Sequence, residues 1–258
     1  MEENKENILC GRNAVIELIK SGNPVHKILL KNEKNSGRNH DLLHLIKEKT
    51  IPYQFVESTI LDKYSAGERH QGVVAFTACK EYVQPEDILK IAQNKNEDPF
   101  ILVLDEIEDP HNLGALLRTA DAAGVHGVII PKRRSAGLTQ IVGRTSAGAV
   151  EYVPVARVSN LVQTLKFLQQ NGCWVSGAES GGRNIYQADL TGPRAIVIGG
   201  EDKGLGRLIR ESCDEMVSIP MMGKISSLNA SVAGSIVMFE VLRQRNQGLS
   251  DISRQSSS

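Results

Sequence analysis

In the second half of the chain, the spacing of apolar positions alternates between two patterns. Near-continuous apolar runs are typical of strands buried on both faces, whereas apolar residues that recur every three or four positions are typical of helices. Runs of the first kind predict strands at 100–104, 125–130, 152–155, 174–178, 195–198 and 216–219. Stretches of the second kind predict helices at 112–123, 139–147, 160–170 and 230–242. Because strands and helices alternate, the pattern predicts an α/β domain with a parallel sheet covered on both faces.

Residues 1–80 repeat this alternation on a smaller scale. After a polar lead, the pattern predicts helices at 11–20, 41–49 and 58–64, strands at 25–30, 52–56 and 72–78, and a polar loop at 32–39. This length suits an independent small α/β domain. Residues 81–98 are mostly polar and predict a linker with one helical stretch at 85–92, so that the larger domain spans 99–246. The serine-rich residues 247–258 predict a disordered tail.

Composition and charge exclude several classes of protein. The 258 residues include 30 basic and 30 acidic side chains, so the pervasive positive charge of many nucleic-acid binders is missing and any RNA site is expected to be a local patch. The four cysteines form no C-x-x-C pair, which predicts reduced thiols in a cytoplasmic protein rather than a zinc site or a disulfide framework. No apolar run approaches the length that spans a membrane.

Two polar loops are candidates for a ligand site. One predicted strand ends at Gly199-Gly200, and Glu201 lies in the turn that follows it. Residues 223–228 form the second loop, which leads to Asn229, a residue suited to cap the last helix. Open α/β sheets bind their ligands beyond the carboxyl ends of their strands, where both loops are predicted to lie.

Three short motifs occur in these loops and in the first helix of the larger domain. They read Asn112-x-Gly114-x-x-x-Arg118, Gly200-Glu201-x-x-Gly204 and Ser227-Leu228-Asn229-Ala230-Ser231-Val232-Ala233. In this order they resemble the motifs of the SpoU/TrmH RNA ribose 2'-O-methyltransferases of the SPOUT superfamily, and three motifs in the family's order make coincidence improbable. Gly11-Arg12-Asn13 and His70-Gln71-Gly72 are weaker motifs that resemble the N-terminal domain of the same family.

The resemblance implies a fold and a reaction. The larger domain would be a trefoil-knot domain, whose C-terminal segment threads through a preceding loop and whose knot loops hold S-adenosylmethionine (SAM). Residues 1–80 would be an L30e-like RNA substrate-binding domain. The implied reaction is SAM-dependent 2'-O-methylation of a guanosine ribose, and the layout is most similar to bacterial enzymes that modify 23S rRNA. A tRNA 2'-O-methyltransferase and a non-catalytic RNA-binding or ribosome-assembly protein of the same fold are the alternatives.

The same resemblance implies the partners of the chain. Members of the superfamily form homodimers through the knot loops and the C-terminal helix, so Val232, Ile236, Val237 and Phe239 are expected to become buried between two subunits. No metal is expected at the site, because methyl transfer from a sulfonium requires alignment and a nucleophilic oxygen.

The resemblance also assigns roles to individual residues. Catalytic roles fall on Arg118, Asn112, Glu201, Ser227 and Asn229, and cofactor contacts on Gly199, Gly200, Ile219, Met221, Leu228 and Asn229. Without the motifs, Arg118 is a solvated arginine, Asn112 a helix N-cap and Glu201 a solvated carboxylate. The family's arginine has been proposed as a general base, but a guanidinium is essentially never deprotonated in proteins. We therefore expect Arg118 to grip a phosphate and to stabilise oxyanion character at the 2'-oxygen.

A pair of histidines and a short basic cluster each allow a functional and a structural interpretation. His40 and His44 lie at i and i+4, as metal ligands can, but no third ligand is near in the sequence, which favours an exposed helix face. Lys132-Arg133-Arg134 follows a predicted strand; it is either solvated surface or, as we favour, a contact for RNA phosphate.

Overall fold

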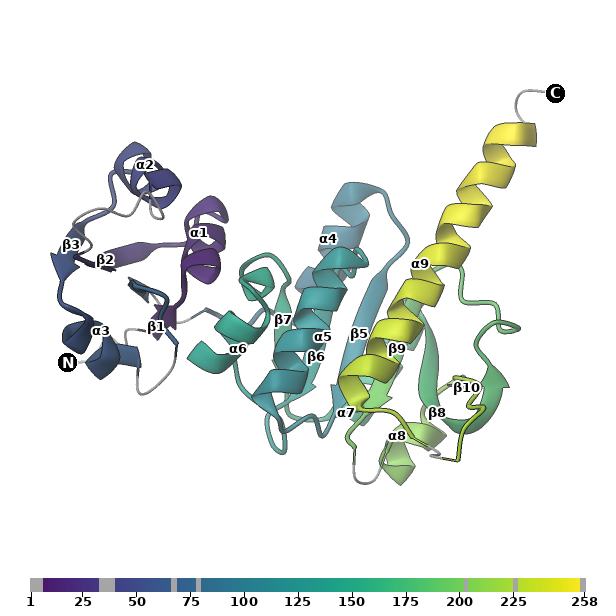
Figure 1. Cartoon of the computed structure of the whole chain (residues 1–258). Helices are drawn as coiled ribbons and strands as arrows, with labels where there is room; N and C mark the ends of the chain where they lie inside the picture. The colour runs from purple at the N-terminus through teal and green to yellow at the C-terminus, as the bar shows by residue number, and fades with distance from the viewer. Residues whose placement is uncertain are drawn as a thin grey trace. The chain divides into compact units, whose positions relative to one another are not determined.

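The chain folds into two units, and each unit is made of two separate stretches of the sequence. The computed structural model describes residues 7–32, 40–65, 69–77, 80–201, 204–224 and 227–255 (Figure 1). Unit 1 comprises Met1–Glu81 together with Gly137–Tyr152, and unit 2 comprises Tyr82–Ala136 together with Val153–Ser258. Most of the predicted polar loop at 32–39 lies outside the described residues. No described helix is long and apolar enough to cross a lipid bilayer.

Unit 1 is built on a four-stranded sheet with helices on both faces. Its strands lie in the order β1 (Asn7–Cys10), β4 (Val73–Thr77), β2 (Val25–Lys31), β3 (Tyr53–Val56). Its first three helices are α1 (Arg12–Lys20), α2 (His40–Glu48) and α3 (Ser58–Ser65). One core joins the sheet to α1 and α2, and a smaller one joins it to α3. The predicted polar lead instead contains β1, whose pairing with β4 is a contact between residues more than sixty positions apart.

The segment 137–152 belongs to unit 1, although the sequence predicted it within the larger domain. It contains α6 (Gln140–Thr145) and the 3-10 helix η2 (Ala149–Glu151), which contact β1 and α1. Tyr152 donates its hydroxyl to Glu17 Oε2 at 2.8 Å, and Asn23 Nδ2 donates to Glu151 Oε2 at 2.6 Å. Chain order could not reveal this arrangement, because the partners of the segment lie more than a hundred residues away.

Unit 2 contains a six-stranded sheet in which neighbouring strands run parallel, as predicted (Figure 1). The strand order is β10 (Glu215–Ser218), β8 (Trp174–Asn184), β9 (Arg194–Gly199), β5 (Phe100–Asp105), β6 (Gly127–Pro131), β7 (Val155–Val158). The helices α5 (Pro110–Ala122) and α9 (Ala230–Gln255) pack against each other and against the sheet. The helices α4 (Pro85–Lys95), α7 (Leu161–Gln170) and α8 (Arg207–Glu211) contribute to a core on the sheet. The predicted parallel α/β architecture is therefore confirmed, and the trefoil knot stays a prediction.

Residues 82–98 of the predicted linker are part of unit 2. Its helix α4 buries Ile88 and Ala92 completely, and a side chain at Gly127 would collide with Ile88. The helix is also fixed at its start, because Gln84 N donates to Asp87 Oδ2 at 3.1 Å and Asp87 N donates to the carbonyl oxygen of Gln84 at 3.0 Å. The polar composition of this stretch reflects the solvent face of one helix rather than a free connection.

The last helix is longer than predicted. The apolar pattern ends at 242, yet α9 continues to Gln255, so the residues 247–255 of the predicted disordered tail are helical. Arg245 helps to hold the extension, since its guanidinium donates to the carbonyl oxygens of Asp98, Pro99 and Gly192 and stacks over Phe100. Hydrophobic periodicity could not predict an anchor made by a cation and backbone carbonyls.

A buried histidine makes the stability of unit 2 depend on pH. His126 Nδ1 accepts from Phe100 N at 3.0 Å, which leaves the proton of the neutral ring on Nε2, 3.0 Å from Glu97 Oε2. Burial lowers the pKa of His126, although Glu97 opposes the shift. The unfolded chain therefore binds a proton near pH 6.5 that the folded protein does not bind, and stability falls as the pH drops below that value.

We expect the Tm of the wild-type protein to fall more steeply between about pH 7.5 and about pH 5.5 than the Tm of His126→Gln. Glutamine can still donate to Glu97 but does not titrate. Thermal denaturation at several pH values measures the difference, and two parallel profiles would contradict the assignment.

Candidate active site

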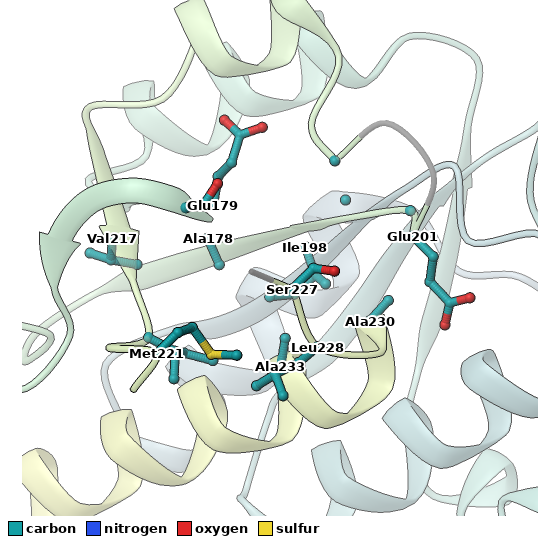
Figure 2. A pocket seen from close by; sticks show the side chains of 15 residues that line it. Ala178, Glu179, Ile198, Glu201, Val217, Met221, Ser227, Leu228, Ala230 and Ala233 are labelled. Carbon is teal, nitrogen blue, oxygen red and sulfur yellow. The ribbon is translucent and has the colours of Figure 1, made fainter. Parts of the chain in front are cut away.

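A cavity lies at the carboxyl ends of β9 and β10, beside the middle of β8 and the start of α9 (Figure 2). Its volume is about 310 Å³, at the small end of the range of roughly 300 to 1,000 Å³ that is usual for small-molecule sites. It is lined by Ala178, Glu179, Ser180, Ile198, Gly199, Gly200, Glu201, Gly204, Val217, Ile219, Met221, Ser227, Leu228, Ala230 and Ala233. The two loops that follow β9 and β10, which the sequence predicted as a ligand site, both line this cavity.

The strand β8 opens one wall of this cavity. β10 pairs with Gly177 through Met216 and then with Arg183 through Val217, so residues 178–182 leave the ladder as a bulge. Three of the lining residues come from this bulge. The predicted strand at 174–178 ended at the point where the ladder breaks, and the sequence pattern did not indicate that β8 resumes beyond it.

The glycine turn after β9 is shaped by close contacts between backbone segments. Gly200 and Gly204 form an antiparallel bridge, and a Cβ atom at Gly200 would lie 2.6 Å from the carbonyl oxygen of Glu106. Gly204 adopts φ +63°, a conformation that favours glycine. Both residues line the cavity, although only Gly200 was predicted to do so, and the neighbouring protein backbone is what requires glycine at Gly200.

Three of the predicted catalytic residues meet in one hydrogen-bonded cluster. Asn112 Nδ2 donates to Glu201 Oε1 at 2.8 Å, and Asn229 Nδ2 donates to Asn112 Oδ1 at 3.0 Å and also to Glu201 Oε1. The residues come from α5, the turn after β9 and the start of α9, far apart in the sequence. We call this arrangement the Asn-Glu-Asn cluster.

The two asparagines differ in their structural roles. Asn229 caps α9 as predicted, because its Oδ1 accepts from Ser231 N at 3.0 Å and from Val232 N at 3.3 Å. The prediction that Asn112 is an N-cap is wrong. α5 begins one turn earlier, where Asp109 accepts from His111 N at 2.8 Å and Pro110 occupies the first position. The buried side chain of Asn112 is therefore free to contact Glu201.

Arg118 lies apart from the cluster. It is exposed on α5 and does not line the cavity. Within the part of the chain that the structure describes, no hydrogen bond or ion pair of its guanidinium is present. Its neighbour Thr119 shares a hydrogen bond of 2.9 Å with Ser235, which places this part of α5 against α9.

A second cavity of about 450 Å³ adjoins the first. It shares Gly200, Glu201 and Gly204 with the first cavity and is further lined by Glu106, Ile107, Glu108, Asp109, Asn112 and Arg134. Arg134 Nη1 donates to Glu106 Oε1 at 2.7 Å. The Asn-Glu-Asn cluster thus lies where the two cavities meet, and the predicted basic group at 132–134 contributes one residue to the second cavity.

Sequence reasoning missed Glu179. This residue lies in the bulge of β8 and lines the first cavity (Figure 2). Arg210 of α8 donates to both of its carboxylate oxygens. No motif surrounds Glu179 in the sequence. Only the bulge, which separates β8 from β10, turns it toward the cavity wall.

Of the six predicted cofactor contacts, five line the first cavity: Gly199, Gly200, Ile219, Met221 and Leu228. Asn229 does not line it and belongs to the cluster instead. Ser227, predicted as catalytic, also lines the cavity.

Comparison with known proteins identifies the class to which this fold and site belong. Residues 99–239 match the SpoU rRNA Methylase family, and residues 8–83 match the family of RNA 2'-O ribose methyltransferase substrate-binding domains. The chain therefore belongs to the SpoU family of RNA methyltransferases, which use SAM as the methyl donor.

Particular relatives support the same assignment. The protein YacO of Bacillus subtilis, assigned to the TrmH family of tRNA/rRNA methyltransferases, is 47% identical over 239 residues, which cover 92% of this chain and 96% of YacO. The SpoU methyltransferase AviRb from Streptomyces viridochromogenes, in complex with AdoMet, superimposes with a TM-score of 0.77 at 26% identity, covering 93% of this chain and 90% of AviRb. An RNA 2'-O ribose methyltransferase gives a TM-score of 0.76 at 25% identity, covering 94% of this chain and 90% of that one.

The lining of the first cavity suits SAM. Ile198, Val217 and Leu228 provide apolar surface for an adenine ring, and the glycine turn brings backbone close to the cavity. Figure 2 shows Glu179 and Glu201 on either side of Ile198. Arg210 already pairs with Glu179, so Glu201 is the carboxylate left to favour a ligand that carries positive charge, as the sulfonium and the amino group of SAM do.

The turn after β9 can be tested by Gly200→Ala. The new methyl group would meet the backbone of Glu106 at 2.6 Å, so the turn must shift. We expect SAM affinity, measured by calorimetry, to fall on the order of tenfold and the Tm to fall as well. Gly223→Ala is the matched control, because a Cβ atom at Gly223 has no neighbour within 4 Å. Equal SAM binding by both variants would contradict a tight turn.

Proposed function

We propose that this protein transfers the methyl group of SAM to the ribose 2'-hydroxyl of a guanosine in 23S rRNA. The observation that carries the proposal is the Asn-Glu-Asn cluster, which lies where the SAM-sized cavity meets the second cavity. A methyl acceptor held at this junction would face the methyl donor. In-line displacement requires such alignment above all.

The cluster and Arg118 have separate roles in the proposed reaction. Glu201 and the two asparagine amides, with Ser227 beside them, position the ribose through hydrogen bonds that their mutual contacts orient. SAM supplies an electrophilic methyl group bound to a cationic sulfur. Arg118 grips a phosphate of the target nucleotide and stabilises negative charge on the 2'-oxygen while its proton leaves to solvent.

The second cavity supports guanosine as the target. The edges of guanine present two acceptors, O6 and N7, and two neighbouring donors, N1–H and N2–H2. Arg134 matches the acceptors and the carboxylates of Glu106 and Glu108 match the donors. Glu106 and Arg134 both adopt positive φ, of 55° and 53°, and such conformations in residues other than glycine are concentrated at functional sites.

We further propose that the enzyme acts as a homodimer through α9. Val232 and Phe239 are 46% and 49% exposed, and Ile236 lies on the same face at helical spacing. Val237, which was predicted in this interface, is instead fully buried within unit 2. Docking of a second subunit on this face would bring Arg118, beside α9, to the subunit interface.

The decisive experiment measures methyl transfer from labelled SAM to separate transcripts of 23S rRNA, 16S rRNA and tRNA. We expect label on 23S rRNA, recovered as 2'-O-methylguanosine after nuclease digestion. Label on tRNA would support the alternative substrate, which the assignment of YacO to tRNA/rRNA methyltransferases keeps open. Absence of SAM binding in calorimetry would overturn the proposal and favour a non-catalytic RNA-binding protein.

A further inference from the structure

The edge strand β3 of unit 1 carries an unusual set of exposed side chains. Tyr53 and Phe55 are 38% and 49% exposed, and Gln54 between them is exposed as well. The strand forms one edge of the four-stranded sheet (Figure 1). Large aromatic side chains on an uncovered edge promote unwanted association between chains. We therefore expect a binding partner to cover these side chains.

The two rings lie on one face of β3. Their register partners on β2, Ile28 and Leu30, point to the same face and are fully buried. The ring centroids lie 5.8 Å apart with the planes at 90°, so the rings touch edge to face. They form a short, solvent-exposed aromatic ledge on the same face of the sheet that α1 and α2 cover over β2.

The backbone of β3 adds hydrogen-bonding groups to this ledge. The carbonyl oxygens of Pro52 and Val56 accept from Ile28 N and Asn32 N of the β2 side. In a parallel pair, alternate residues direct both backbone groups to the partner strand. The N–H and C=O groups of Tyr53 and Phe55 therefore point away from β2, toward the open edge.

A cation is held next to the same strand. Lys27 Nζ donates to Gln54 Oε1 at 2.9 Å, which fixes the ammonium group at the edge of the sheet. We call Tyr53, Gln54, Phe55 and Lys27 together the β3 surface. It combines two aromatic rings on one face of the sheet, outward backbone donors and acceptors at the edge, and a positive charge on the opposite face, because Gln54 alternates with Tyr53 and Phe55 along the strand.

We propose that the β3 surface binds an unpaired segment of the substrate RNA, with one base stacked on Phe55 and a neighbouring base on Tyr53. Unpaired bases offer faces that stack on aromatic side chains and edges that hydrogen-bond with backbone groups. Lys27 is the partner for a phosphate at the point where the same segment passes over the strand edge to the opposite face of the sheet. This inference rests on the proposed function, because it takes RNA as the substrate. It adds a second RNA site, which lies in unit 1.

RNA is favoured over a peptide strand for this surface. A peptide that extended the sheet would use the outward backbone groups but would require neither the aromatic pair nor the cation. The unit also matches a family of substrate-binding domains of RNA methyltransferases. Both observations indicate a polyanion with exposed bases.

The test compares Phe55→Ala and Phe55→Leu in the full-length enzyme. Leucine keeps apolar volume but removes the aromatic face. We expect both variants to raise KM for 23S rRNA on the order of tenfold, the size of one lost base–aromatic stack, with kcat and SAM affinity unchanged. Trp174→Ala is the matched control, since Trp174 is an exposed aromatic residue of unit 2 at the amino end of β8. It should leave KM unchanged.

A direct binding measurement separates this inference from the proposed function. Phe55→Trp in a Trp174→Phe background places the sole tryptophan on the β3 surface. An unstructured oligoribonucleotide should quench its fluorescence and the duplex form should not. Unchanged fluorescence, full activity of Phe55→Leu, or capture of a peptide strand without RNA binding would overturn the inference while methyl transfer by the wild type stands. Loss of all RNA methylation by the wild type would instead overturn the proposed function.

Discussion

Replacing Arg118 with alanine is expected to lower kcat for RNA methylation by about two to three orders of magnitude, the usual cost of removing a group that stabilises developing negative charge. The change should leave the fold intact. Arg118 is exposed, and within the described residues its guanidinium has no hydrogen-bond or ion-pair partner to lose. SAM affinity should also persist, because Arg118 does not line the first cavity.

The division of the effect between kcat and KM identifies the role of Arg118. A residue that only grips phosphate raises KM, whereas one that stabilises the transition state lowers kcat. Arg118→Lys serves as the control, because it keeps the charge but loses the planar, bidentate fork, and it should recover a part of the activity. Full activity of Arg118→Ala would contradict the assignment, as would loss of its SAM binding.

The position of Arg118 also makes the subunit arrangement testable. If Arg118 serves the cavity of the other subunit, Arg118→Ala and Glu201→Ala subunits mixed in one dimer form one complete site from their intact halves. We expect such mixtures to regain activity that neither variant has alone. No recovery in a verified mixed dimer would place Arg118 in the site of its own subunit.

Replacing Arg194 with methionine is expected to lower the free energy of unfolding by about 3–5 kcal/mol, a large part of the total stability of a domain. Arg194 is 6% exposed at the start of β9. Its Nη1 donates to Glu215 Oε1 at 2.8 Å and to Ser176 Oγ at 3.0 Å. Its Nη2 donates to the carbonyl oxygens of Asp189 and Thr191. Burial lowers the pKa of Arg194, but Glu215 and Asp189 oppose the shift.

The effect arises because methionine leaves the half-buried Glu215 without its cation and two backbone carbonyls without their donor. Denaturant unfolding of the full chain measures it. Glu215→Gln should cost less, since Arg194 keeps its other acceptors. Arg207→Met is the matched control, because the ion pair of Arg207 with Glu211 is solvent-exposed at 3.7 Å and should matter little. Similar losses for Arg194→Met and Arg207→Met would contradict the buried network.

The sequence alone was sufficient for the elements that the local pattern controls. Apolar runs predicted β5, β6 and β9, and helical spacing predicted α1, α5 and α7 close to their observed bounds. The loops that surround the first cavity were predicted as well, because strand ends and glycine turns have local signatures. The motif residues Asn112, Glu201 and Asn229 were identified by resemblance, and no local signal showed that they touch.

The failures of prediction have physical causes in long-range contacts. β1 was missed because three apolar residues are too few to form a pattern, and its stability comes from β4. Residues 81–98 were taken for a linker with one helical stretch at 85–92, because a helix with one buried stripe is polar elsewhere. Asn112 was taken for a cap because the true start of α5, at Asp109 and Pro110, lies only three residues earlier.

Periodicity and short motifs were enough to predict the α/β class, the order of most elements and the family to which the chemistry belongs. Which distant residues meet depended on the tertiary fold. It joined Asn112, Glu201 and Asn229 into one cluster, assigned 137–152 to unit 1, and turned Glu179 toward the cavity. The reason is physical: a motif or a hydrophobic period records the preferences of neighbouring residues. The contacts that build the site join residues tens to more than a hundred positions apart, and folding brings these residues together only by burying the sheet between its helices.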